Sequence, residues 1–363
     1  MAESTVATAM PGKERNQRVG FFMETSFHYE VYQNIIAELI KQKVSCELVI
    51  NDLIEPEFVS EMLVFLKTLV VPGLDCTLLS VALRQPTPYG CLLSPYFINW
   101  VAPLAKVHIR TLYGLAKESW NHAAWNAQYH TVLCYSHYTQ RGLAKFGNGK
   151  VVGNPRFDDW HQQRVGTELL DSLKLDPAKQ TLLYAPTYGE LSSLPHWMEK
   201  VGRLSHDYNV ITKLHHGTLN RPSERTLLKH VKRHLKTIVS DNRLTFPLLQ
   251  KADYVLSDNS GFVFDAIHAN KKVILLEWQG MGVLLKEGKS FSTEQSPEQR
   301  VRAFLPSVTD MIELRQSLAA EVDWEQHRSS LEQIKIEYCD AFQDGKAAQR
   351  AAEAVLSALS QAN

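Results

Sequence analysis

The chain has 363 residues, which is long for one domain of ordinary size and suits two. Hydrophobic residues make up 44% and charged residues 21%, a globular composition that excludes extensive disorder. Lys plus Arg equals Asp plus Glu at 39 each, so no overall basic field attracts nucleic acid, and any anion must be bound by a local site.

The chain opens on a polar stretch rich in small residues, and we expect residues 1–17 to form a flexible leader rather than a secretory signal. The most apolar stretch, MLVFLKTLVVPGL, contains Lys67 and Pro72 and is shorter than the roughly 20 residues that span a bilayer. The five cysteines are scattered and form no CxxC pair, which is typical of reduced thiols. We therefore expect a cytoplasmic protein, with peripheral contact at the inner face of the cell membrane left open.

From residue 18, short apolar runs alternate with longer amphipathic runs, which is typical of a parallel sheet covered by helices. The alternation predicts an N-terminal Rossmann-like domain over residues 18–154, with residues 70–95 unassigned because they carry several Pro and Gly. The predicted strands lie in VGFFME, CELVIND, KVHIRTLYG, TVLCYS and KVVGNP. The predicted helices lie in HYEVYQNIIAELIKQK, EPEFVSEMLVFLKTL, LAKESWNHAAWNAQ and HYTQRGLAKFG.

The alternation restarts after a charged connector and predicts a second Rossmann-like domain over residues 155–305, followed by a helical segment over 306–363. Its predicted strands lie in TLLYAPT, NVITKLH, KTIVS, ADYVLSD and KVILLEW. The predicted fold class is therefore α/β, with two Rossmann-like domains facing a cleft and a C-terminal helical tail. This plan resembles that of GT-B transferases and sugar-nucleotide 2-epimerases. Since ligands of open α/β sheets bind beyond the carboxyl ends of the strands, candidate site residues are sought there.

Several familiar nucleotide and metal motifs do not occur. No GxGxxG follows the first strand, no GxxxxGK[ST] occurs, and no DxD triplet is present to hold a divalent metal against a diphosphate. We therefore expect no cofactor and no metal requirement, so that His, Lys and backbone N–H groups would neutralise phosphate.

SDNSGF, residues 257–262, lies where a predicted strand passes into a helix. Free N–H groups at a helix start bind anions, and Ser260 and Gly261 would let phosphate oxygens approach closely. Asp258, Asn259 or Ser260 would equally well cap the helix. The segment predicts either a phosphate site or a cap.

Two other strand ends of the second domain carry polar side chains. TKLHHGT places Lys213, His215 and His216 after a strand, where they would contact phosphate or protonate a leaving oxygen, or form a solvated loop. YAPTYGE places Thr187 and Tyr188 after another strand, where they would face a nucleotide or form a plain turn.

The first domain offers an acceptor side. His28 follows the first strand and is a candidate general base, because its ordinary pKa of about 6.5 suits proton abstraction. Packing of His28 against Tyr32 at a helix start is the alternative. Tyr113, Gly114 and Lys117 follow another strand and would orient an acceptor or begin the next helix.

Taken in order, five segments resemble the motifs of the CDP-glycerol glycerophosphotransferase family, which builds teichoic-acid and related capsule polymers. They are YGLAK at 113–117, GNPRFD at 153–158, YAPTY at 184–188, KLHH at 213–216 and SDNSGFVFD at 257–265.

This resemblance assigns roles to individual residues. It implies that His215 contacts donor phosphate with Lys213 close by. It matches Asp258, Ser260 and Asp265 to the family's phosphate-binding helix start and later Asp. It also matches Arg156 and Asp158 to a segment at the domain junction whose role is structural or functional.

The chain departs from the family's motifs at three positions. Tyr113 stands where the family has the histidine regarded as its base, and a tyrosine with a pKa of about 10 is a poor base at neutral pH. His28 is the substitute we predict from position. Gly261 replaces a serine and Tyr188 replaces a tryptophan, so the donor could differ from CDP-glycerol.

The resemblance implies a transferase that moves a phospho-polyol from a CDP-activated donor to a glycan or lipid-linked acceptor, with no nucleic acid involved. A GT-B glycosyltransferase and a UDP-sugar 2-epimerase remain alternatives, as does a nucleotide-binding subunit without catalysis.

Overall fold

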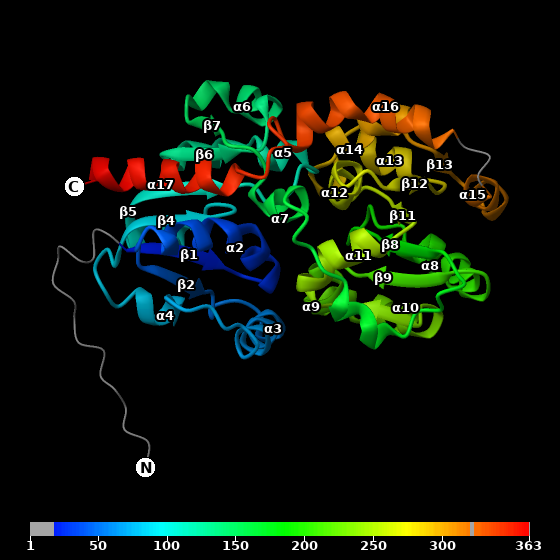
Figure 1. Cartoon of the computed structure of the whole chain (residues 1–363), viewed down its shortest axis with the longest axis horizontal. Coiled ribbons are helices and arrows are strands. Elements are labelled where there is room, and N and C mark those ends of the chain that lie inside the picture. The colour runs from blue at the N-terminus through cyan, green and yellow to red at the C-terminus, as the bar shows by residue number, and fades with distance from the viewer. Residues whose placement is uncertain (1–17, 320–322, 363) are drawn as a thin grey trace, which may run out of the picture.

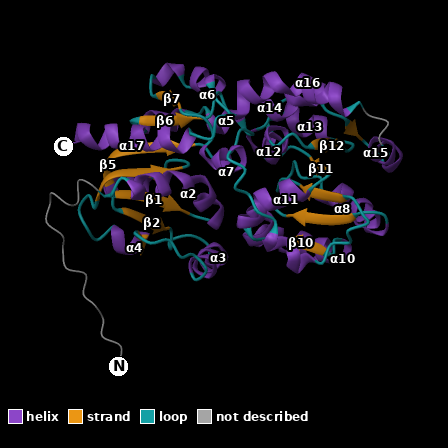
Figure 2. Ribbon diagram, in the orientation of Figure 1, coloured by secondary structure: helices purple, strands orange, loops and turns teal. Residues whose placement is uncertain are grey.

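The computed structural model describes residues 18–319 and 323–362, so the predicted leader lies outside the described residues. Two parallel β-sheets lie side by side with helices packed over them, and the chain passes from the first sheet to the second near the middle of the sequence (Figures 1 and 2). The architecture is the predicted pair of Rossmann-like α/β domains.

The first sheet has seven parallel strands in the order β3-β2-β1-β4-β5-β6-β7. They are β1 (Val19–Met23), β2 (Cys46–Ile50), β3 (Leu74–Leu78), β4 (Tyr89–Ser94), β5 (Ala105–Thr111), β6 (Thr131–Cys134) and β7 (Gly149–Val151). All residues of β1, β2 and β4 are buried, as expected for parallel strands covered on both faces. The unassigned residues 70–95 contain the edge strand β3 and the central strand β4.

The second sheet has six parallel strands in the order β10-β9-β8-β11-β12-β13. They are β8 (Thr181–Ala185), β9 (Asn209–Lys213), β10 (Thr237–Val239), β11 (Tyr254–Ser257), β12 (Lys272–Leu276) and β13 (Ser307–Val308). β8, which carries YAPTY, lies between β9, which leads into KLHH, and β11, which leads into SDNSGF. Three motifs that are far apart in the sequence therefore meet at one edge of the sheet.

The helices of the first domain include one region that differs from expectation. They are α2 (Ser26–Lys41), α3 (Pro56–Leu66), α4 (Leu79–Ala82), α5 (Glu118–Asn121) and α6 (His137–Gly142). The helix predicted over LAKESWNHAAWNAQ is wrong, since only α5 and a 3₁₀ turn at Ala124–Gln128 form there. The side chains of Asn121 and Asn126 accept hydrogen bonds from Arg110 at 2.6 and 2.7 Å, and such local polar bonding competes with a regular helix.

The helices that follow the domain junction cover the second sheet and then return to the first. They are α7 (Asp158–His161), α8 (Leu194–Arg203), α9 (His216–Asn220), α10 (Arg225–His234), α11 (Thr245–Lys251), α12 (Phe262–His268), α13 (Met281–Lys286), α14 (Pro297–Arg300), α15 (Met311–Leu318), α16 (Trp324–Ile334) and α17 (Ala347–Ala362).

The last 58 or so residues, predicted as a helical tail, are shared between the two domains. β13 pairs with β12 and so extends the second sheet, whereas α17 packs on α2, β4 and β5 of the first domain (Figure 1). The Asp158 carboxylate fixes the start of α17 by accepting hydrogen bonds from the N–H groups of Ala347 and Ala348 at 3.0 and 2.7 Å. Burial raises the pKa of Asp158 to about 6. The motif residue Asp158 is thus part of the junction between the domains.

Candidate active site

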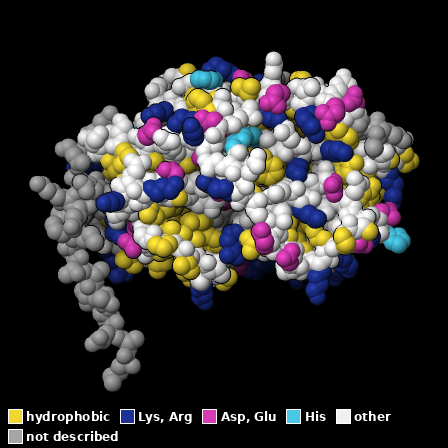
Figure 3. All heavy atoms as spheres, in the orientation of Figure 1, with side chains coloured by type: hydrophobic (Ala, Val, Ile, Leu, Met, Phe, Trp, Pro, Cys, Tyr) yellow, Lys and Arg dark blue, Asp and Glu magenta, His cyan; other side chains and the backbone are white. Residues whose placement is uncertain are grey.

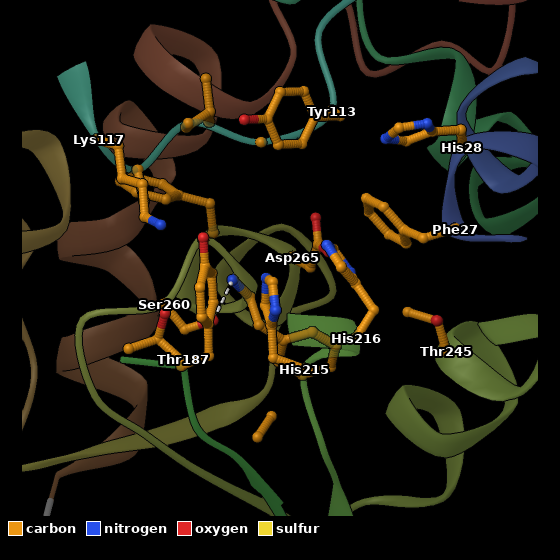
Figure 4. Close-up of a pocket in the computed structure, with 18 of the residues that line it drawn as sticks. Phe27, His28, Tyr113, Lys117, Thr187, His215, His216, Thr245, Ser260 and Asp265 are labelled. Carbon is orange, nitrogen blue, oxygen red and sulfur yellow. Dashed lines mark hydrogen bonds between the residues drawn. The ribbon is translucent and has the colours of Figure 1, made fainter. Parts of the chain in front are cut away.

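A pocket of about 460 Å³ lies between the two domains and is lined by residues that follow strands of both sheets. This volume is in the range of small-ligand sites. In Figure 4, His28 and Phe27 of the first domain lie across the pocket from His215, Thr187 and Ser260 of the second. The predicted residues that line it are His28, Tyr113, Gly114, Lys117, Thr187, Tyr188, Lys213, His215, His216, Asn259, Ser260, Gly261 and Asp265.

His215 presents a hydrogen-bond donor to this pocket. Its Nδ1 accepts a hydrogen bond from the Gly217 N–H at 2.9 Å, which caps α9, so the proton of the neutral ring is on Nε2. Burial, with further help from His216, holds its pKa well below the ordinary value, and the ring is neutral at pH 7. The ring stacks on Tyr188 with centroids 4.4 Å apart. His215 is therefore a fixed neutral donor suited to a phosphate oxygen.

Cations surround the Tyr188 ring. The Lys117 ammonium of the first domain lies 4.5 Å from the ring centroid, and the Arg221 guanidinium of the second lies 5.4 Å from it. A Cβ at Gly217 would approach the Tyr188 ring to 2.8 Å, so the stacked arrangement depends on glycine there. Tyr188 thus holds two positive charges at the edge of the pocket, one from each domain.

Lys213 belongs to a buried network of charges. Its Nζ donates to Asn242 Oδ1 at 3.2 Å. Burial lowers its pKa, and the carboxylate of Glu30 opposes that effect. Arg156 contacts both oxygens of Asp265 at 3.1 and 3.0 Å and lies 3.7 Å from Glu30. Asp265 was predicted to face donor phosphate, but its carboxylate is engaged by Arg156. Its position supports a role in fixing Arg156 at the junction.

The SDNSGF segment divides into a supporting part and a pocket-lining part. Asp258 is fully buried, and its two oxygens accept the N–H groups of Thr187 and Ser193 at 2.8 and 2.7 Å. This geometry contradicts the predicted phosphate contact of Asp258, because its carboxylate binds backbone N–H groups and does not line the pocket. Asn259 lines the pocket, but its amide bonds Leu191 and Gln299, so it too is mainly a support.

Ser260 and Gly261 lie at the start of α12 and face the pocket. Ser260 Oγ accepts the N–H of Phe262 at 3.2 Å, but the cap residue of α12 is Gly261, so Ser260 supports the turn before the helix rather than capping it. A Cβ at Gly261 would come no nearer than 3.8 Å to Ala116, so the position would admit a serine. The loss of the family's second serine is therefore not forced by packing.

His28 is in the pocket but not in the form of a base. Its Nδ1 accepts the Glu24 N–H at 3.1 Å, so the neutral ring carries its proton on Nε2 and donates. Burial lowers its pKa to about 3. The alternative of packing against Tyr32 does not describe its main ring contacts, because the rings nearest to His28 are those of Tyr96 and Tyr113, with centroids 5.7 and 6.3 Å away. We therefore correct the role predicted for His28 from base to hydrogen-bond donor.

Sequence reasoning missed a group of residues on the first-domain wall. Glu24 follows β1, and its carboxylate accepts hydrogen bonds from Asn51 and Tyr96. The pocket is also lined by Phe27, Tyr96 and Trp120 of the first domain, and by Phe291 of the second. The position of Glu24 directly after a fully buried strand was the available signal, but a single acidic residue matches no motif.

One further cluster has the composition of a metal site. His161, His268 and Asp340 bring ligand atoms within 4.8 Å of one another, the one such group found among the described residues. The two Nε2 atoms lie 3.0 Å apart, which fits a hydrogen bond, and the buried Nδ1 of His268 has no partner among the described residues. Metal-bound histidines usually donate their other N–H to a partner, so the cluster fits a His–His hydrogen bond better than a metal centre.

The two parallel sheets with a pocket between them have the arrangement of the GT-B fold. The chain matches the family model described as CDP-Glycerol:Poly(glycerophosphate) glycerophosphotransferase over residues 115–357, which is more than half of its length. It therefore belongs to this glycerophosphotransferase family and is a transferase. Membership implies a nucleotide-activated donor and a glycan acceptor.

Solved structures support the same fold. The wall teichoic acid polymerase TagF has a TM-score of 0.66 at 13% identity, covering 97% of this chain and 91% of that one. A putative UDP-N-acetylglucosamine 2-epimerase from Listeria monocytogenes has a TM-score of 0.59 at 15% identity, covering 94% and 96%. The UDP-GlcNAc 2-epimerase from Neisseria meningitidis bound to UDP-GlcNAc has a TM-score of 0.58 at 13% identity, covering 94% and 99%. A search among curated protein sequences finds no match.

Proposed function

We propose that the protein transfers a glycerol phosphate-like phospho-polyol from a CDP-activated donor to a hydroxyl group of a glycan or lipid-linked acceptor in cell-surface polymer synthesis. The observation that carries the proposal is the contrast between the two pocket walls. The second-domain wall presents the neutral N–H of His215 and the ring of Tyr188, which holds one cation from each domain, and the first-domain wall presents mainly aromatic rings.

The donor diphosphate lies against the second-domain wall in this proposal. His215 donates to a phosphate oxygen through Nε2, while Lys117 and Arg221 offset the negative charge at the pocket edge. The hydroxyl of Thr187 and the start of α12 at Ser260 and Gly261 complete the wall. Fixed donors in a site of low polarity stabilise developing charge far better than water does, and removal of one such donor typically costs 10²–10³ in rate.

The acceptor lies against the first-domain wall. Trp120 contacts Phe291 and Tyr96, with ring centroids 5.4 and 6.3 Å away, and Tyr113 lies 5.9 Å from Tyr96. Aromatic rings suit the apolar faces of a sugar, and the Glu24 carboxylate disfavours a second anion. These features support a glycan end as the acceptor rather than a strongly anionic chain.

The reaction conserves every atom. The acceptor O–H bond breaks as its oxygen bonds the β-phosphorus, the bond from that phosphorus to the bridging oxygen breaks, and CMP leaves with the electron pair. Positioning of the acceptor oxygen in line with the leaving oxygen supplies much of the acceleration.

We also propose that the reaction needs no resident metal or cofactor. The support is the set of protein cations at the pocket, Lys117, Lys213 and Arg221. The test is turnover after dialysis against EDTA, with and without added Mg²⁺ or Mn²⁺. Activity within twofold of the undialysed enzyme supports the proposal, and activity restored only by added metal contradicts it.

The donor is tested with a panel of CDP-polyols and UDP-sugars, each assayed for nucleotide release with a glycan acceptor and for donor-induced thermal stabilisation. CMP release from a CDP-polyol is the expected result. UDP release from a UDP-sugar would indicate a glycosyltransferase, and a 2-epimer formed without acceptor would indicate an epimerase. Donor binding without turnover for any acceptor would indicate a non-catalytic subunit.

We propose a cytoplasmic enzyme that contacts an anionic membrane surface peripherally. No helix among residues 18–319 and 323–362 is long and apolar enough to cross a membrane. Leu63, Val64 and Val70, in and after α3, are exposed by 43%, 64% and 87%. Figure 3 shows hydrophobic side chains gathered over the region of α3 and α4. An ion pair between Arg225 and Glu57 joins α3 to α10, whose exposed side chains include Lys229, Lys232 and Arg233.

Co-sedimentation with phosphatidylglycerol and phosphatidylcholine vesicles tests this contact. We expect binding to the anionic vesicles that falls at least tenfold in the Lys229→Glu/Lys232→Glu/Arg233→Glu variant, because each basic residue near such a surface contributes about 1 kcal/mol. The matched control is Lys286→Glu, an exposed change on α13. Equal binding of all three proteins, or no binding, contradicts the proposal.

A further inference from the structure

The first-domain wall needs a group that accepts the proton of the attacking hydroxyl, and neither Tyr113, at the position of the family's base, nor His28, the predicted substitute, supplies it. Burial raises the pKa of Tyr113 above its ordinary value of 10, so its hydroxyl is protonated at neutral pH. The Nδ1 of His28 is occupied by the Glu24 N–H, and its Nε2 carries a proton. Both side chains therefore donate hydrogen bonds and neither accepts a proton.

Glu24 is the carboxylate on this wall. It follows β1 directly and is partly exposed to the pocket. Neighbouring strands hold it on both sides, because Asn51 follows β2 and Tyr96 follows β4, and β1 lies between these strands. Asn51 Nδ2 donates to Oε1 at 2.6 Å, and the Tyr96 hydroxyl donates to Oε2. Each oxygen keeps a lone pair for a further proton.

The carboxylate also lies close to the position of the family's base. The ring of Tyr96, whose hydroxyl binds Glu24, is 5.9 Å from the ring of Tyr113. His28 fixes the Glu24 backbone by accepting its N–H on Nδ1, and its ring lines the pocket with the remaining N–H on Nε2. Near the ends of β1, β4 and β5, the Glu24 carboxylate is thus the proton acceptor among these side chains, and Tyr96, Tyr113 and His28 are hydrogen-bond donors.

His216 is the other side chain with an available ring nitrogen. No hydrogen bond to it is found within residues 18–319 and 323–362, and it lines the pocket between Phe27 and Phe58. His216 follows β9 beside His215, and its ring packs on Phe27 and Phe58 of the first domain, so it lies between the two walls. Glu24 lies wholly on the first-domain wall, where we place the attacking hydroxyl, and this position favours Glu24.

We propose that Glu24 is the general base, taking the proton of the acceptor hydroxyl as the oxygen attacks the β-phosphorus, with Asn51 and Tyr96 holding the carboxylate in place. This inference rests on the proposed function and assigns to a carboxylate the step that a histidine performs in the family motif. The proton moves from the acceptor oxygen to a Glu24 oxygen, and the new P–O bond forms as CMP departs.

The charge state of Glu24 is consistent with this role. Burial raises its pKa above 4.5, hydrogen bonds from Tyr96 and Asn51 oppose that rise, and the charges that act on it are Glu55 before α3 and Arg221 after α9. His28 faces it from α2 as a neutral donor. Since a base must be deprotonated, kcat should fall as the pH drops through this raised pKa.

The test compares wild type, Glu24→Gln and the matched control Glu55→Gln with the best CDP-polyol of the panel. Glutamine keeps the size of Glu24 and one oxygen that can accept from Asn51, and its NH2 group can donate to the Tyr96 hydroxyl once that hydroxyl turns, but it cannot take a proton. We expect kcat to fall 10²- to 10⁴-fold in Glu24→Gln, which is the usual contribution of a general base. We also expect the fall of kcat at low pH, the acid limb of the pH profile, to disappear in this variant. The donor Kd should change less than threefold, and Glu55→Gln should match wild type.

Three results would overturn the assignment. The first is a kcat of Glu24→Gln within tenfold of wild type. The second is an acid limb of Glu24→Gln that equals that of wild type, and the third is loss of donor binding together with turnover. A loss of kcat with donor binding kept in His216→Asn, but not in Glu24→Gln, would move the role to His216. Wild type that turns over no CDP-linked donor would overturn the proposed function and the base with it, whereas active wild type and equally active Glu24→Gln would overturn the base alone.

Discussion

The two walls of the pocket differ in how they are encoded. The second-domain wall comes from short contiguous segments, KLHH, YAPTY and SDNSGF, that follow three adjacent strands. The first-domain wall combines the YGLAK segment with isolated side chains such as Glu24, Tyr96 and Trp120, which belong to no motif. Both walls depart from the family's motifs, at Tyr188 and Gly261 on the second-domain wall and at Tyr113 on the first-domain wall. Only the change at Tyr113 replaces the residue regarded as the family's base, so we expect the acceptor side to differ more in its chemistry than the donor side.

The assignment of the donor to the second-domain wall is tested most directly at His215, where we expect the largest effect of a substitution. His215→Asn keeps a side-chain oxygen that caps α9 through the Gly217 N–H but removes the ring N–H that faces the pocket. We expect kcat/KM for the CDP-linked donor to fall 10²- to 10³-fold, with the melting temperature close to that of wild type. His215→Ala should lose the same activity and also stability, because the cap is lost.

These two variants separate donor binding from folding. The measurements are nucleotide release, donor Kd and thermal unfolding. If His215→Asn kept wild-type kcat/KM, the second-domain wall would not be the donor wall, and the contrast between the walls would fail.

A second prediction concerns the charge state of the acceptor wall. His28 is neutral when folded, with a pKa lowered to about 3 by burial, whereas an unfolded histidine titrates near 6.5. Below pH 6.5 the unfolded chain binds a proton that the folded chain does not, so stability is lost as the pH falls from 6.5 towards 3. At pH 5 this amounts to about 2 kcal/mol relative to pH 8, or roughly thirtyfold in the unfolding constant.

Urea unfolding at pH 8 and pH 5 measures this difference. The loss of unfolding free energy between the two pH values should be about 2 kcal/mol smaller in His28→Gln than in wild type. His230→Gln is the control, because it removes an exposed histidine of α10. The same loss in His28→Gln as in wild type would contradict a neutral His28 and, with it, the hydrogen bond that fixes the Glu24 backbone.

The sequence predicted the fold and the location of the site better than it predicted the role of each side chain. Alternating apolar runs gave both sheets, because buried parallel strands are apolar throughout. β4 was missed because TPYGCLLSPY places a central strand between prolines. The helix over LAKESWNHAAWNAQ was wrong, because the bonds of Asn121 and Asn126 to the buried Arg110 depend on tertiary contacts.

The candidate site shows the same limit. KLHH and SDNSGF were predicted at strand ends and do meet there, since strand order brings β8, β9 and β11 together. A sequence does not reveal which way a carboxylate points, so Asp258 was taken for a phosphate contact although it binds backbone N–H groups. Glu24 was missed for the same reason, because its partners Asn51 and Tyr96 are 27 and 72 residues away in the chain.

The smallest effect is expected from the aromatic part of the acceptor wall, and it tests whether the first-domain wall binds the acceptor and not the donor. Trp120 lines the pocket and packs on Phe291, with ring centroids 5.4 Å apart, so Trp120→Ala removes a large apolar surface without touching the second-domain motifs. We expect the acceptor KM to rise about tenfold, equivalent to about 1.4 kcal/mol, which is typical of a lost aromatic contact, while the donor Kd stays within twofold. The control is Trp278→Ala, which removes a tryptophan that stacks on His196 in the second domain and does not line the pocket. Acceptor KM and donor Kd are measured separately for both variants. A rise in donor Kd without a change in acceptor KM for Trp120→Ala would place the nucleotide on the first-domain wall and reverse the assignment of the two walls.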